Sequence, residues 1–174
     1  MFTLKNLSLV KYLLPLAHLF FVPFASYAQL TVAGGLTATQ MANIIAGPGI
    51  TISNALYTGP AISSGSFNGS ASNIGLASGV LLTCGDINQA VGPNTLGSAG
   101  VDNLAPGNSD LNGLAGATTY DAVELEFDFV AQSNNVSFDY VFGSEEYPEW
   151  VSSGYNDAFA FFINSIRLFS RSSL

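Results

Sequence analysis

Residues 121–130 carry the clearest pattern of hydrophobic and polar positions in the chain. The apolar positions Val123, Leu125, Phe127 and Phe129 alternate with Ala122, Glu124, Glu126 and Asp128. A period of two places successive side chains on opposite faces of a β-strand. The pattern therefore predicts a strand with one buried face and one acidic face that is open to solvent.

A second alternation follows the polar stretch 132–135. Val136, Phe138, Tyr140 and Phe142 fall on one side of this segment, and Ser137, Asp139 and Val141 fall on the other. Two alternating segments joined by a short polar turn are typical of a hairpin, so we predict that 121–130 pairs with 136–142. The apolar run 157–163 predicts a further, more fully buried strand.

The preceding part of the chain is less regular. Residues 30–79 combine short apolar stretches with Gly, Pro and Asn, which favours short strands joined by turns. Residues 85–120 are typical of a long loop that is functional or held by a ligand. No segment shows a convincing amphipathic helical pattern. We therefore predict an all-β fold, an antiparallel, jelly-roll-like β-sandwich that is incomplete.

Residues 1–28 predict a signal peptide. Lys5 and Lys11 precede an apolar run at 13–24, and Ser26-Tyr27-Ala28 has the small residues typical of a signal-peptide cleavage site. A transmembrane anchor is disfavoured because about a dozen apolar residues are too few to cross about 30 Å of hydrocarbon. We expect an exported, extracellular or cell-surface protein that begins at Gln29 and has no stable membrane insertion after cleavage.

The charge distribution narrows the range of partners. All twelve carboxylates lie between Gln29 and Ile166, a stretch without Lys or Arg. Nucleic acid and anionic lipid require basic side chains to neutralise their phosphates, so neither is an expected partner. Carboxylates without balancing cations repel one another, which makes a bound divalent metal worth considering.

The densest set of candidate metal ligands lies between residues 143 and 157. Its oxygen donors occupy two stretches that a loop could bring together: Glu145, Glu146, Asn156 and Asp157. Ca²⁺ takes about six to eight oxygen ligands of these types, which predicts a calcium site at one edge of the sandwich. The alternative, that these side chains are solvated and one of them caps backbone amides, remains open.

Residues 108–113, Asn-Ser-Asp-Leu-Asn-Gly, resemble the first half of a looped calcium motif. The match is weak because Asn108 replaces the usual first Asp and Thr119 stands where a bidentate Glu is needed. Ordinary turn chemistry is the favoured interpretation.

Catalysis is not expected. The only histidine, His18, lies in the predicted leader, so a hydrolase would need two carboxylates about 5 to 9.5 Å apart, as in glycosidases. Glu124 and Glu126 meet that spacing, at about 7 Å along a strand, but their face is expected to be open to solvent. A carbohydrate-active enzyme is therefore only the alternative to a noncatalytic module.

Two other features bear on binding and stability. Tyr147, Trp150 and Tyr155 flank the acidic turn, where they could stack on a glycan or anchor an extracellular protein; alternatively, at least one of them closes the end of the core. The single Cys84 cannot form an internal disulfide, and its apolar neighbours predict a buried, inert thiol.

Several of these segments resemble the choice-of-anchor L domain of bacterial cell-surface and secreted proteins. The most specific are Ser-Glu-Glu-Tyr at 144–147 and Asn-Asp-Ala-Phe at 156–159, and the others lie at 72–76, 79–82, 92–94, 110–112, 125–129 and 140–143. The resemblance spans about 47–163. It implies a β-rich surface module near the N-terminus of long exported proteins with varied C-terminal anchoring or sorting signals, and it implies no established ligand or activity.

Residues 164–174 depart from that resemblance, because basic residues reappear where a Gly-Pro turn and further strands are expected. We interpret 29–163 as the N-terminal part of the domain and 164–174 as a tail that arises from a frameshift, a premature stop or an assembly error. The expected function is a noncatalytic surface or adhesion module stabilised by calcium. The alternatives are a carboxylate-based carbohydrate-active enzyme and a truncated structural fragment without independent function.

Overall fold

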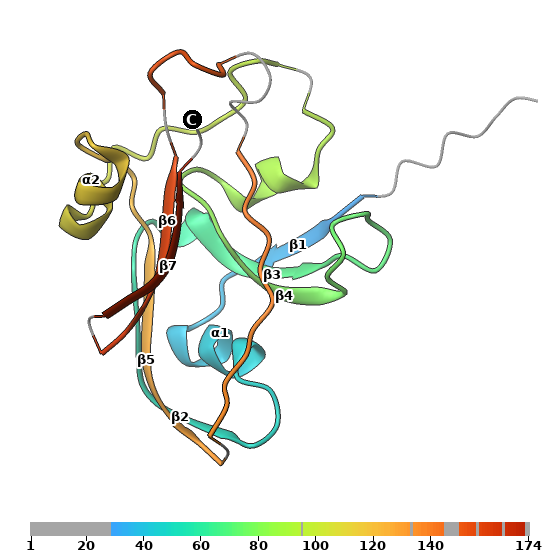
Figure 1. Ribbon diagram of the computed structural model, residues 1–174. Helices are drawn as coiled ribbons and strands as arrows, with labels where there is room; N and C mark the ends of the chain where they lie inside the picture. The colour runs from blue at the N-terminus through green and yellow to red at the C-terminus, as the bar shows by residue number, and fades with distance from the viewer. Residues whose placement is uncertain are drawn as a thin grey trace, which may run out of the picture.

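The computed structural model describes residues 29–94, 96–132, 134–144, 150–155, 157–164 and 166–172. Within these residues the chain forms one three-stranded and two two-stranded antiparallel sheets, accompanied by two short α-helices (Figure 1). The predicted signal peptide lies outside the described residues.

The three-stranded sheet has the order β1-β3-β4, formed by β1 (Thr31–Gly34), β3 (Ser64–Asn68) and β4 (Ser78–Leu82). Gly65 lies opposite Gly34 in the register, and a Cβ at Gly65 would overlap the carbonyl oxygen of Ala33. Short strands form in residues 30–79 as predicted, except at 38–45, where the chain is helical. The close approach of β1 and β3 explains why a residue without a side chain stands at position 65.

The second sheet pairs β2 (Ile50–Thr58) with β5 (Glu124–Ala131). The predicted alternation of β5 is confirmed, because Leu125, Phe127 and Phe129 are half-buried whereas Glu124, Glu126 and Asp128 are exposed. The predicted hairpin partner is wrong, since β5 pairs with β2 and not with 136–142.

A one-residue bulge in β2 makes this pairing possible. The register shifts between Ser53 and Leu56, and Asn54 adopts a left-handed φ of 52°. The Asn54 side-chain amide donates a 2.7 Å hydrogen bond to the carboxylate of Asp128 on β5. An extra residue in a strand exchanges the faces of the even and odd positions that follow it. Ile50 and Ile52, before the bulge, and Tyr57, after it, can therefore all lie on the less exposed face of the sheet.

The segment 136–142 was predicted as a strand but forms none, and its aromatic side chains pack on the third sheet. That sheet pairs β6 (Ala158–Ile163) with β7 (Ile166–Ser172). The ring centroids of Phe138 and Phe161 are 4.1 Å apart, and those of Phe142 and Phe159 are 5.9 Å apart. The alternation therefore identified the apolar face of 136–142 correctly. The β6 strand is also confirmed, although it is half-buried to exposed and not fully buried as predicted.

Two α-helices correct the all-β prediction to a mixed fold: α1 (Ala38–Ile45) and α2 (Ser109–Ala115). A capping box begins α1, because the Thr37 hydroxyl accepts from the Gln40 N–H at 3.2 Å and the Gln40 side chain accepts from the Thr37 N–H at 2.8 Å. The Thr-x-x-Gln spacing was the sequence signal for this helix. Eight residues are about two turns, too few to show a clear helical period.

The core lies where α1 packs on the sheets. Its buried apolar side chains are Leu30, Met41, Ala42, Ala46 and Ile87. Ile87 belongs to the 3-10 helix η4 (Ile87–Val91), and a second 3-10 helix, η3 (Ala61–Ser63), precedes β3. Met41 is fully enclosed, so α1 supplies the centre of this core.

Asp121 holds the loop 85–120 in place, a stretch that contains η4 and α2 and is therefore not the unbroken loop that was predicted. Its side chain is only 8% exposed and accepts hydrogen bonds from the backbone N–H groups of Asn103, at 2.9 Å, and Ala105, at 2.6 Å. The Asn103 side chain in turn donates to Ser63 Oγ and to the Cys84 carbonyl. Within the described residues this loop is therefore held by side-chain hydrogen bonds from the protein itself.

The sheets remain small, separate units. In the described part of the chain they do not close into a jelly-roll sandwich. Twenty large hydrophobic side chains are exposed there, against five buried apolar ones. Cys84, two residues after β4, is also exposed, so the predicted burial of its thiol is wrong. Its backbone carbonyl accepts a hydrogen bond from the Asn103 side chain. No helix within the described ranges is long and apolar enough to span a bilayer.

Candidate functional site

Three of the four predicted calcium ligands lie outside the described residues. They are Glu145, Glu146 and Asn156, whereas Asp157 is half-buried directly before β6. Among the residues that the structure describes, no three His, Cys, Asp or Glu side chains gather closely enough to hold a metal ion. The calcium site therefore stays a prediction.

The stretch 108–113 is the start of α2, with no looped calcium motif. The Asn108 side-chain oxygen accepts from the N–H groups of Asp110, at 2.8 Å, and Leu111, at 3.3 Å, which makes it the N-cap of the helix. The Asn112 side-chain oxygen accepts from the backbone N–H of Thr119 at 2.6 Å and from its hydroxyl at 2.8 Å. These oxygens are used in local hydrogen bonds, and the segment forms a capped helix instead of the ordinary turn that was favoured.

The exposed face of β5 forms an acidic strip with the first turn of α2. Burial raises the pKa of the Glu124 carboxyl, the negative charges of Glu126 and Asp110 raise it further, and a 3.4 Å hydrogen bond from the Asn108 side chain partly offsets the rise. Glu124 and Glu126 share this face as predicted. The face is open, so it lacks the enclosed setting that a hydrolytic carboxylate pair uses.

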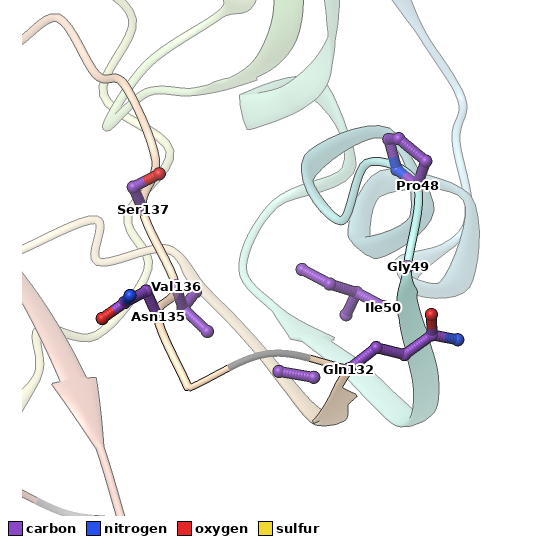
Figure 2. A pocket seen from close by; sticks show the side chains of 8 residues that line it. Pro48, Gly49, Ile50, Gln132, Asn135, Val136 and Ser137 are labelled. Atoms are coloured by element: carbon purple, nitrogen blue, oxygen red, sulfur yellow. The ribbon is translucent and has the colours of Figure 1, made fainter.

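A hollow of about 280 Å³ opens at the other end of the β2–β5 pair (Figure 2). Residues 48–50 line one side of it and residues 135–137 another. Ala131 and Gln132 complete the lining. None of the lining side chains is titratable. Glu124 begins the strand whose last residue, Ala131, lines the hollow, so Glu124 and the hollow lie at opposite ends of β5.

The turn 150–155 presents two aromatic side chains to solvent. The Ser153 N–H donates to the Trp150 carbonyl at 3.0 Å, and Ser152 and Gly154 adopt left-handed φ values of 62° and 96°. This reversal brings the Trp150 and Tyr155 rings into a T-shaped contact, with centroids 5.2 Å apart and planes at 72°. The Trp150 ring is 39% exposed and Tyr155 is 66% exposed.

A hydrogen bond fixes the orientation of the Trp150 indole. Its Nε1–H donates to the carbonyl oxygen of Gly97, which is distant in the sequence. Tyr155 does not close the core, and its exposure is compatible with the binding alternative for this residue. Tyr147 lies outside the described residues. The sequence carried no signal for Gly97, because its contribution is a backbone carbonyl placed by the tertiary fold.

Comparison with known proteins gives one match. The family model of the choice-of-anchor L domain matches residues 31–172. The matched span contains all the strands and both α-helices described above, and it continues past residue 163, where the motif resemblance ended. No curated protein and no solved structure matches the chain.

Proposed function

Because the chain belongs to the choice-of-anchor L domain family, we propose that it is a noncatalytic, exported surface module that attaches to a cell, to extracellular matrix or to a glycan. The observation that carries this proposal is the aromatic face formed by 136–142 and β6. Phe138 and Tyr140 remain exposed although they contact Phe161. A contiguous exposed apolar surface typically marks an interaction site.

The charge of the chain supports the same class of function. Residues 29–166 contain carboxylates and no Lys or Arg, which argues against nucleic acid and anionic lipid as ligands. The N-terminal segment has basic residues, an apolar run and a cleavage site with small residues, and this combination supports export. An acidic exported module with exposed aromatic side chains is suited to neutral or basic extracellular ligands.

A retention assay tests the proposal. The purified exported chain should bind saturably to cells or matrix-coated surfaces and leave those surfaces chemically unchanged. A Phe138→Ser/Tyr140→Ser variant should bind about tenfold more weakly, because aromatic anchors carry much of the binding energy of an interface. Leu104→Ser, which changes another exposed apolar side chain, is the matched control and should bind as the parent does.

Two results would contradict this function. Retention no better than that of an unrelated acidic protein would remove the adhesion proposal. Release of sugars from a glycan would instead favour the carboxylate-based enzyme, with Glu124 and Glu126 as the first residues to replace. Circular dichroism of each variant separates lost binding from lost folding.

The proposal includes a stabilising calcium ion held by Glu145, Glu146, Asn156 and Asp157. The contact between Trp150 and Tyr155 supports it, because the chain enters and leaves this turn at neighbouring points. Such a reversal would let the two acidic stretches that flank the turn converge. The high density of carboxylates in the chain also favours a bound cation.

Calcium is expected to raise the melting temperature of the chain. A ligand that binds only the folded state, at about 100 times its Kd, stabilises that state by about 2.7 kcal/mol. Extracellular calcium modules have Kd values of about 0.1 to 1 mM, so calorimetry should span that range. The shift should vanish in a Glu145→Ala/Asp157→Ala variant and persist in Glu126→Ala. An unchanged melting temperature at saturating CaCl₂ would refute the site.

The small antiparallel sheets also support a finer proposal for the fold. Strand β5 alternates half-buried and exposed side chains, as does a strand that turns one face to the inside of a β-sandwich. We therefore propose that these sheets are parts of a jelly-roll-like sandwich that is incomplete in the described residues.

A further inference from the structure

We propose that Tyr155 and Trp150 form a stacking platform for the pyranose rings of an uncharged polysaccharide. This inference rests on the proposed surface function and adds to it a second site, distinct from the aromatic face of 136–142 and β6, with its own ligand class. The platform stands on the 150–155 turn, separate from the acidic strip of β5 and from the hollow in Figure 2.

The geometry of the two rings suits stacking. Tyr155 is 66% exposed, so its ring offers apolar surface to solvent. The ring centroids of Trp150 and Tyr155 are 5.2 Å apart and the planes are at 72°, so the two rings contact each other and face different directions. A pyranose has an apolar face of C–H groups, and such a face packs against an aromatic ring while the sugar hydroxyls remain free to form hydrogen bonds.

The platform is preorganised. The Trp150 N–H is bonded to the Gly97 carbonyl, and the turn is closed by the Ser153 N–H on the Trp150 carbonyl. The indole therefore keeps its orientation before a ligand arrives. A ring that is already held loses less conformational freedom on binding, which favours affinity on a small surface.

The groups beside the rings favour a neutral, hydroxylated ligand. Ser152 and Ser153 are exposed residues of the turn, and their hydroxyls can donate to or accept from sugar hydroxyls. The chain has no Lys or Arg between residues 29 and 166 to bind a uronate or a sulfate. Its many carboxylates would repel such anionic groups, so the platform selects uncharged sugars over acidic ones.

Retention on polysaccharides tests this site. The full exported chain is applied to insoluble cellulose and chitin, and its migration is measured in gels that contain laminarin or alginate. The parent should be retained by at least one of the three neutral polymers and not by anionic alginate. Tyr155→Ala should weaken retention about tenfold or more, whereas Tyr155→Phe, which keeps the ring, should bind as the parent does.

Two further variants make the test specific. Tyr120→Ala removes a tyrosine that is 74% exposed and pairs with Pro106 in an isolated bridge, so it should leave retention unchanged. Trp150→Phe keeps an aromatic ring but loses the donor to Gly97, and it should weaken retention less than Tyr155→Ala does. Equal retention of Tyr155→Ala and the parent would overturn the platform, as would a preference for alginate.

The outcomes also separate this inference from the proposed function. If the chain binds cells or matrix but no neutral polysaccharide, or if protease treatment of the surface abolishes binding, the platform is wrong and the adhesion function stands. If the chain binds neither surfaces nor polysaccharides, both proposals are wrong.

Discussion

Replacing Asp121 with Ala is expected to lower the free energy of unfolding by about 3 kcal/mol, as measured by denaturant titration. The carboxylate is buried and accepts from the N–H groups of Asn103 and Ala105, so its loss leaves two part-buried donors without an acceptor. Asp121 also has a φ of 51°, a conformation that Ala adopts less readily than Asp or Asn. Both effects act in the same direction.

Two variants identify the cause of this loss. Asp121→Asn keeps one carbonyl acceptor and tolerates the left-handed backbone, so its cost should be smaller, at about 1 kcal/mol. Asp102→Ala removes an exposed carboxylate whose hydrogen bond to the Leu104 N–H is local, and it should cost under about 1 kcal/mol. If Asp121→Ala is as stable as Asp102→Ala, the loop 85–120 is not held by this network.

The substitution Gly107→Ala is expected to destabilise the fold by about 2 to 4 kcal/mol. A Cβ at Gly107 would overlap the backbone carbonyl of Thr119, and both residues lie beside the bridge between Pro106 and Tyr120. A backbone atom cannot move aside as the end of a flexible side chain can. The loop must therefore shift and weaken the hydrogen bonds between Asn108 and Thr119.

The same substitution at Gly113 is the matched control. Gly113 lies inside α2, and a Cβ at this position would meet no atom within 4 Å apart from the local helix backbone, so Ala fits there without strain. Ala also stabilises a helix interior by about 0.8 to 1 kcal/mol relative to Gly. The two glycines should therefore give changes of opposite sign in thermal or denaturant unfolding. Equal changes at both positions would show that the contact with Thr119 does not restrict position 107.

The candidate binding residues were predicted from the sequence only in part. The sequence pointed to Trp150 and Tyr155 because aromatic side chains flank an acidic turn, and the structure exposes both of them. It could not show that the rings meet, since that contact depends on left-handed conformations at Ser152 and Gly154. The contribution of Gly97 was also hidden, because any residue type can supply a backbone carbonyl.

Local patterns by themselves determined that β5 is a strand and which sides of β5 and of 136–142 are apolar. They did not determine that 136–142 stays outside the sheets or that 38–45 forms a helix. The family followed from short motifs in the same way. The acidic character of residues 29–166 needed only the composition.

Only the tertiary structure decided which segments pair. Strand β5 joins β2 across more than sixty intervening residues, through a bulge and the hydrogen bond from Asn54 to Asp128. Short-range patterns favour the nearest partner, but pairing depends on which distant segment completes the packing, and that information is spread along the chain. For the same physical reason the sequence revealed the apolar face of 136–142, while the fold determined that this face packs on β6.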